Sequence, residues 1–316
     1  MTTLLGYNTN GLAHHDLFDA VELLAEIGYR SVAITIDHGA LSPREDWRGQ
    51  LRRLRSTLQR LGLRSAIETG ARFLLDPRAK HEPTLVSPDP AARARRIEFY
   101  RHAIRCAAEL ESSCVSLWSG VPRPEALRRA RMEREAASSR PSKTPGVPPD
   151  AGVPPEAIPD AETMRLLAAG LEEVLEYASE SGVIIGFEPE PGMVVDSMAR
   201  FAELLALIDS PNLKLTLDIG HLQCQGEVPI PDQIRRWSSR LVNVHLEDTR
   251  RGRHEHRMFG EGEIDFPPVL QTLAEVGYQG AIHVELSRHS HEAPEAARRA
   301  FAFLQPLTQR MGASHG

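Results

Sequence analysis

Several features that define other classes of protein are scarce in this chain of 316 residues. Its three cysteines, Cys106, Cys114 and Cys224, are widely spaced and give neither a disulfide framework nor a Cys-x-x-Cys metal motif. Such sparse cysteine usage fits a reducing interior. No apolar run approaches the roughly 20 residues of a membrane-spanning helix, and the N-terminus lacks the basic and apolar segments of a signal peptide. We therefore expect a cytoplasmic protein with no membrane partner.

An excess of positive charge is also absent. The chain has 37 Lys and Arg against 43 Asp and Glu, a net charge of −6. A general basic bias toward nucleic acid is therefore missing, and we expect no nucleic-acid partner. The 41% apolar content is enough for a sizeable core, and the length suits one large domain or two average ones.

Strand-like and helix-like segments alternate along the chain. Apolar runs with period-two or β-branched character predict strands, the sixth of them within 213–221. The other seven are Leu4–Asn8, Ser31–Ile36, Leu63–Ile67, Cys114–Leu117, Val183–Glu188, Leu241–His245 and Gly280–Glu285. Helical spacing predicts helices between and after them, at Asp16–Ile27, Trp47–Leu61, Ala91–Leu110, Glu162–Ser181, Met198–Ile208, Pro231–Ser238, Pro267–Val276 and Ala293–Met311. Eight such βα steps indicate an α/β fold, a single (β/α)8 TIM barrel over residues 1–316.

Two connections are unusually long. Thr69–Pro90 follows a predicted strand end and could serve as a lid or substrate loop. Residues 121–160 follow the fourth strand and are rich in Pro and Ala. Their composition predicts a flexible insertion, and a flap over the site is the alternative.

Four successive predicted strands end in an ionisable residue. These residues are Glu188, Asp218, His245 and Glu285. Parallel strands in a closed barrel would bring them to one point at the end where such folds place their chemistry. Carboxylates crowded together raise each other's pKa, and a divalent cation resolves the conflict. Three carboxylates and one imidazole suit Mn, Mg, Co or Zn, so we predict one divalent metal ion bound by these four residues.

The motifs in the second half of the chain carry a family resemblance. They are G-F-E-P at 186–189, L-D-I-G-H at 217–221, N-V-H-L-E-D at 243–248, H-x-H-x-x-x-G-E-G at 254–262 and H-V-E at 283–285. With them the chain resembles the sugar-phosphate isomerase/epimerase superfamily, the xylose-isomerase-like TIM barrels that include the apurinic endonuclease branch. The resemblance implies that the four strand-end residues bind one metal. It also implies that Glu188 and Glu285 are the catalytic acid/base pair on opposite faces of the substrate carbon.

This chemistry defines the expected function. Isomerising or epimerising a sugar, or a related polyhydroxy keto compound, removes a weakly acidic C–H beside a carbonyl. A metal stabilises the enediolate as a Lewis acid, and one carboxylate removes the proton while another returns it. The resemblance makes His221 and Arg251 contacts to substrate oxygens, although Arg251 could equally belong to a solvated basic loop. His256 could contact the substrate or a second metal, and Trp118 could form a wall against a sugar face.

Other functions stay open on the sequence. The same residues would serve a metal-dependent hydrolase, dehydratase or lyase, and a barrel that only binds a metabolite is a further alternative. In the endonuclease branch, residues at the positions of His254 and His256 hold further zinc ions, together with histidines from the third and fourth strand ends. Here those ends read Glu68-Thr69-Gly70 and Trp118-Ser119-Gly120, so a three-metal site is not expected. The resemblance also allows a homodimer.

Overall fold

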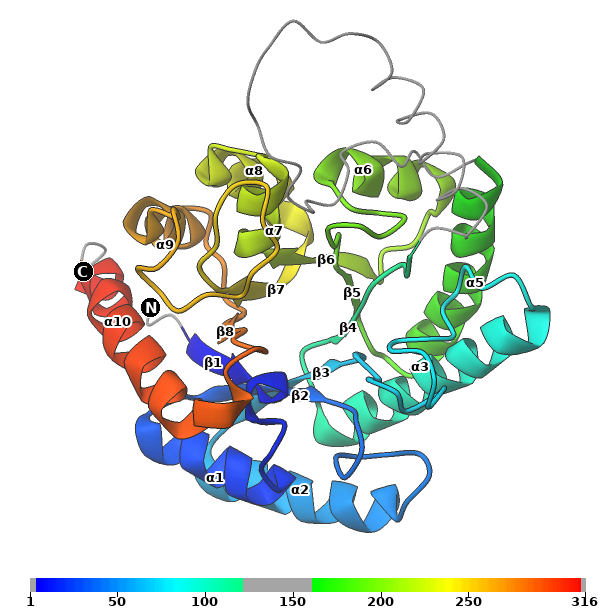
Figure 1. The fold of residues 1–316 in the computed structure, drawn as a ribbon, viewed down its shortest axis with the longest axis horizontal. Helices are drawn as coiled ribbons and strands as arrows, with labels where there is room; N and C mark the ends of the chain where they lie inside the picture. Colours follow the sequence, from blue (N-terminus) through cyan, green and yellow to red (C-terminus); the bar gives the residue numbers. More distant parts are fainter. Residues whose placement is uncertain (1–3, 122–160, 314–316) are drawn as a thin grey trace, which may run out of the picture.

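The structure, a computed structural model, describes residues 4–121 and 161–313. Eight short strands form its centre (Figure 1). They are β1 (Leu4–Asn8), β2 (Ser31–Thr35), β3 (Arg64–Glu68), β4 (Val115–Leu117), β5 (Ile185–Phe187), β6 (Leu213–Asp218), β7 (Leu241–Leu246) and β8 (Ala281–Val284). Each strand pairs in parallel with the next, and β8 pairs in parallel with β1, so the sheet closes into a barrel. The predicted TIM barrel is confirmed, and all eight C-terminal strand ends lie at one end of it.

Helices surround the barrel (Figure 1). The helices are α1 (Leu17–Ile27), α2 (Trp47–Leu61), α3 (Pro90–Leu110), α5 (Ala161–Glu180), α6 (Met198–Leu207), α7 (Ile219–Gln225), α8 (Ile230–Trp237), α9 (Phe266–Glu275) and α10 (Ala293–Ala313). The described residues also form three short 3₁₀ helices, η1 (Thr9–Leu12), η2 (Ser238–Arg240) and η3 (Ser290–Glu292). Local signals set several boundaries: Asp16 caps the start of α1 by accepting a hydrogen bond from the Phe18 N–H. At the end of α2, Gly62 adopts the left-handed conformation that favours glycine.

One helix was not predicted. The sequence predicts Asp218 at the end of the sixth strand and the next helix only at Pro231–Ser238, but α7 begins at once, at Ile219. Asp218 ends β6 and also caps α7, because its Oδ1 accepts a hydrogen bond from the backbone N–H of His221 at 2.8 Å. This cap fixes the direction in which His221 leaves the barrel.

The main apolar core lies between the strands and the helices. Successive side chains of a strand point to opposite faces. Val32 and Ile34 of β2 join the main core, whereas Ala33 between them belongs to a small separate cluster with Ala66 and Cys114. This part of the barrel interior therefore holds small side chains with Ile184 and Val242 packed against them, which leaves room for ionisable groups nearer its C-terminal end.

The insertion predicted at 121–160, with its alternative role as a flap, lies outside the described residues except for Val121. Of the helices that the structure describes, none has both the length and the apolar character needed to cross a bilayer.

Candidate active site

Four ionisable side chains meet at the C-terminal end of the barrel. Glu188 follows β5, Asp218 ends β6, His245 lies in β7 and Glu285 follows β8. Their ligand atoms, one from each side chain, all lie within 4.8 Å of one another. We call these four residues the strand-end cluster. Parallel strands in a closed barrel bring them together as the sequence analysis expects.

His245 lies in the middle of the strand-end cluster. Its Nδ1 is 3.0 Å from Glu188 Oε1, 3.0 Å from Glu285 Oε2 and 3.9 Å from Asp218 Oδ2. Its Nε2 lies on the other side of the ring, 3.1 Å from Oε1 of Glu68 at the end of β3. Nδ1 therefore faces the three carboxylates of the cluster, and Nε2 faces the Glu68 carboxylate and the Asn243 amide, whose Nδ2 is 3.0 Å away.

The cluster is electrostatically costly in the protein alone. Burial raises the pKa of Glu188 to about 8, although His245 opposes the rise. Burial and the charge of Glu285 raise the pKa of Asp218 to about 6. Burial disfavours the charged form of His245, but Glu188, Glu68 and Glu285 outweigh it and hold its pKa well above the ordinary value. For Glu285 the neighbouring His245 outweighs burial and lowers the pKa.

Asp218 supplies a direct test of whether these residues fit a cation. Its Oδ1 is used by the helix cap, but its Oδ2 is buried and has no hydrogen-bond partner among the described residues. A buried carboxylate oxygen left unpaired is unfavourable. Three carboxylates and an imidazole form a ligand set suited to Mn, Mg, Co or Zn. The residues of the strand-end cluster therefore fit a divalent metal ion, and either a cation or a proton would relieve their repulsion.

A cavity of about 420 Å³ opens beside the cluster. Its walls combine polar strand ends with the loop after β3. Among the lining residues are Asn10, Glu68, Arg72, Lys80, His81, Trp118, Glu188, Glu190, His221, His254, His256, Glu285 and Arg288. The size suits a small molecule, and the wall carries both cationic and anionic groups.

A second cavity, of about 500 Å³, lies at the opposite end of the barrel. It is lined by residues at the strand beginnings, including Ser31, Arg64, Leu241 and Ala281. None of the candidate metal-ligand groups in the described part of the chain belongs to its lining. Because barrel enzymes carry their chemistry at the C-terminal strand ends, the cavity beside the strand-end cluster is the candidate active site.

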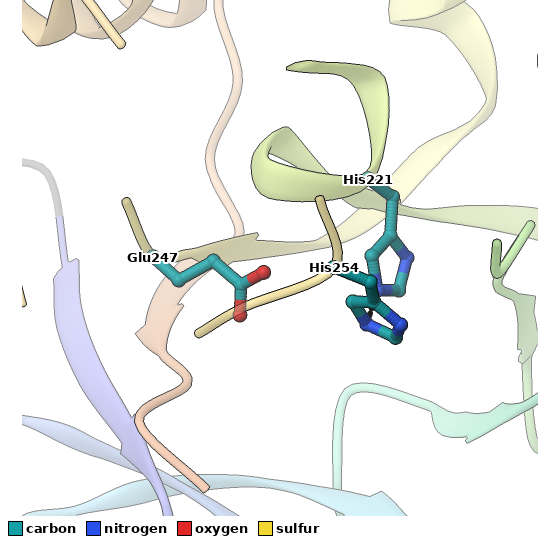
Figure 2. A group of neighbouring side chains, drawn as sticks. All are labelled: His221, Glu247 and His254. Carbon is teal, nitrogen blue, oxygen red and sulfur yellow. Dashed lines mark hydrogen bonds between the residues drawn. The ribbon is translucent and has the colours of Figure 1, made fainter. Parts of the chain in front are cut away.

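A further group of ligand-type side chains adjoins the same cavity. Figure 2 shows the Glu247 carboxylate on one side and the imidazoles of His221 and His254 on the other. Ligand atoms of these three residues lie within 4.8 Å of one another, as do those of Glu247, His256 and Glu285. Each of these groups could also hold a metal ion.

Glu247 is fully buried at the end of β7. Its Oε2 contacts His256 Nδ1, and its Oε1 has no hydrogen-bond partner in the described structure. Burial and the charge of Asp218 hold its pKa well above the ordinary value. Gly220 makes room for this side chain, because a Cβ there would overlap the Glu247 carboxylate.

His221 and His254 contact each other directly. His221 Nδ1 lies 3.0 Å from the carbonyl oxygen of Pro189, and only a protonated ring nitrogen can donate to that acceptor. In the neutral ring Nε2 of His221 then carries the lone pair and acts as an acceptor, and it lies 3.1 Å from His254 Nε2. Burial and the neighbouring His256 lower the pKa of His221 to about 3, so the ring is neutral near pH 7.

The remaining predicted site residues divide into two sets. Trp118 and His256 line the cavity, and the Trp118 ring stands edge to face with His81 at 5.3 Å between ring centroids. Arg251 is exposed and is not part of the cavity lining. Its guanidinium lies over Gly226 instead. The predicted contact of Arg251 with the substrate remains a prediction.

Comparison with known proteins fits this geometry. The family model described as "Xylose isomerase-like TIM barrel" matches residues 21–307. The chain belongs to this family. The fold and the family that the sequence motifs indicate are thus both confirmed.

Individual proteins show what this chain is similar to. L-ribulose-5-phosphate 3-epimerase UlaE of Shigella flexneri serotype 5b is 26% identical over 281 residues, 88% of this chain and 84% of that protein. Inosose dehydratase of Lacticaseibacillus casei is 31% identical over 144 residues, which cover 40% of this chain and 48% of that protein. A solved L-ribulose 3-epimerase shares the fold with a TM-score of 0.70 at 18% identity, covering 99% of this chain and 96% of that one.

Three residues of this site, Glu247, Glu190 and Asn10, are not among those that the sequence predicts. Glu247 stands two positions after His245, and that spacing places both on one face of the strand end. Glu190 lines the cavity, where burial and the charge of Glu188 raise its pKa to about 8. Asn10 donates a 2.7 Å hydrogen bond from Nδ2 to Glu285 Oε1. The contact of Asn10 leaves no local sequence signal, because only closure of the barrel creates it.

Proposed function

We propose that this protein is a divalent-metal-dependent epimerase or isomerase of a sugar or a related polyhydroxy keto compound. The observation that carries the proposal is the strand-end cluster, with four ligand atoms within 4.8 Å and Asp218 Oδ2 left without a partner in the described residues. The similarity to a sugar-phosphate 3-epimerase over most of both chains supports the substrate class. When bound by Glu188, Asp218, His245 and Glu285, the metal would supply Lewis-acid stabilisation of negative charge on the substrate oxygens.

The chain's own residues would hold the substrate in the cavity. Trp118 presents an aromatic surface on one wall, a suitable contact for the apolar face of a sugar. His256 lines the same space as a polar group that can bind a hydroxyl. The neutral His221, oriented by its bond to Pro189, also lines it. Together they would select a polyhydroxylated molecule with an apolar edge.

Proton transfer falls to Glu188 and Glu285. The two carboxylates follow β5 and β8, and each has an oxygen 3.0 Å from His245 Nδ1. A substrate carbon between them would lose its proton to one carboxylate and regain a proton from the other, which inverts the centre or moves the carbonyl. Asn10 holds Glu285 by its hydrogen bond to Oε1.

A dehydratase is the second candidate. It is supported by the 31% identity to an inosose dehydratase, which covers less than half of that protein. Dehydration starts with the same proton removal, and the departing hydroxyl then needs an acid. His256 lines the cavity and could act on it, whereas burial and the neighbouring His221 lower the pKa of His254 to about 2 and keep that ring neutral.

Solvent deuterium uptake tests the proposal. The purified protein, loaded with Mn, would be incubated in deuterated buffer with a panel of ketoses and their phosphates, and the products analysed by NMR. We expect deuterium at a carbon next to the carbonyl, in a product that is otherwise an isomer of the substrate. The rate of deuterium uptake should fall at least about 100-fold in Glu188→Gln and in Glu285→Gln.

A matched control for these variants is Glu180→Gln, which removes an exposed carboxylate at the end of α5. This variant should keep the wild-type rate. Loss of water from the substrate would favour the dehydratase. Full activity in both site variants would contradict the assigned acid/base pair.

A further inference from the structure

A continuous chain of buried hydrogen bonds runs through the barrel interior to the strand-end cluster. Ser31 Oγ lies 2.9 Å from His283 Nε2, and His283 Nδ1 lies 2.8 Å from Asn243 Oδ1. Asn243 Nδ2 lies 3.2 Å from Glu68 Oε1 and 3.0 Å from His245 Nε2, and the same Glu68 oxygen is 3.1 Å from His245 Nε2. The five side chains come from β2, β8, β7 and β3, and each is no more than 6% exposed.

The barrel is shaped to hold this chain. Gly6 of β1 faces His283, and a Cβ at Gly6 would overlap the imidazole ring. Both ring nitrogens of His283 contact uncharged groups, a hydroxyl and an amide. A fully buried imidazole in such surroundings is favoured in its neutral form, in which one nitrogen donates and the other accepts.

Three members of the chain leave its direction open. A serine hydroxyl, an asparagine amide and a neutral imidazole can each donate on either side. In one direction Ser31 donates to His283, rather than to the Arg64 carbonyl oxygen 3.2 Å away, and His283 donates to Asn243. In the other direction every bond is reversed, and Asn243 turns its oxygen toward Glu68.

Glu68 removes this ambiguity. A carboxylate offers only acceptors, so in our assignment Asn243 Nδ2 and His245 Nε2 both donate to Oε1 and lie 3.0 Å apart around this shared acceptor. The reversed direction would place Asn243 Oδ1 against Glu68 Oε1, at the 3.2 Å that now separates Nδ2 from it. Two acceptors at that distance repel each other.

We propose that Glu68 is the positioning residue of the metal site, setting the direction of the buried chain so that His245 donates from Nε2 and presents Nδ1 to the strand-end cluster. The role of Nδ1 as a metal ligand rests on the proposed function, whereas the direction of the chain does not. Asn243, His283 and Ser31 follow the direction that Glu68 sets. Asn243 holds the Glu68 carboxylate directly, and His283 and Ser31 hold Asn243, in the manner of outer partners that orient metal-binding histidines.

The direction can be read from the tautomer of His283 in the metal-free protein. The full-length protein would be labelled with ¹⁵N-histidine, and the imidazole nitrogens recorded by long-range ¹H–¹⁵N correlation. The His283→Gln variant identifies the signals of His283. We expect His283 protonated at Nδ1. In Glu68→Gln we expect both tautomers, because an amide can donate or accept. Protonation at Nε2 in the wild type, or an unchanged single tautomer in Glu68→Gln, would overturn the proposal.

Metal affinity tests the consequence for His245. Isothermal titration with Mn should show a loss of about 10- to 100-fold in Glu68→Gln, with all four ligands of the strand-end cluster intact. Ser116→Ala is the matched control, because Ser116 is buried beside Glu68 in β4 and its Oγ has no hydrogen-bond partner in the described structure. It should keep both the tautomer and the affinity. Equal affinity in Glu68→Gln would overturn the positioning role, whereas no Mn binding by the wild type would refute the proposed function instead.

Discussion

Asn10 Nδ2 lies 2.7 Å from Glu285 Oε1, although 275 positions separate the two residues in the chain. Asn10 lies in η1, directly after β1, and Glu285 directly follows β8. The contact exists because β8 pairs with β1 and closes the barrel. Closure of the fold thus supplies a hydrogen-bond donor to one carboxylate of the proposed acid/base pair.

Loss of this donor should slow the reaction. Asn10→Ala removes a hydrogen bond to a charged acceptor, which contributes about 1.5–3 kcal/mol. We expect kcat to fall about 10- to 100-fold, with metal content unchanged because Asn10 is outside the strand-end cluster. Steady-state kinetics and elemental analysis of the same sample check both points. A normal kcat would show that Asn10 does not hold Glu285 for catalysis.

Glu190 gives the metal-free protein a defined pH dependence. Its pKa in the folded chain, about 8, exceeds the ordinary value. The unfolded chain therefore releases this proton at a lower pH, and the free energy of unfolding falls as pH rises toward 8. Glu188 acts in the same direction. Between pH 5.5 and pH 8, Glu190 should account for a loss of roughly 1–3 kcal/mol.

Glu190→Gln should reduce that loss. Thermal unfolding in EDTA at both pH values measures it, with Glu180→Gln as the exposed control. The fall in the free energy of unfolding between pH 5.5 and pH 8 should be smaller in Glu190→Gln and unchanged in Glu180→Gln. An identical fall in all three proteins would show that Glu190 does not ionise in this range.

The group formed by His221, Glu247 and His254 makes a prediction about metal stoichiometry. Our account needs one divalent ion, held by the strand-end cluster. Glu247→Gln should therefore keep about one ion per chain by elemental mass spectrometry. Two ions in the wild type that fall to one in this variant would assign the second ion to Glu247 and its histidines (Figure 2).

The sequence predicts the barrel and the strand-end cluster because both follow from repeated local patterns. Each of Glu188, Asp218, His245 and Glu285 stands at the end of an apolar run, and parallel closure does the rest. Helix α7 escaped prediction because its seven residues are too few to show a helical period. Glu247 packs against Gly220 of α7, and a Cβ at Gly220 would overlap its carboxylate. This contact joins the loops after β6 and β7, so no local sequence pattern predicts it.

Elemental mass spectrometry of the purified protein tests the central claim most directly. The wild type and the Glu188→Gln, Glu285→Gln double variant would be loaded with Mn, desalted and compared. We predict about one ion per chain in the wild type and loss of that ion in the double variant, with a folded barrel by circular dichroism. Equal metal content in the two proteins, or no metal in the loaded wild type, would contradict the account.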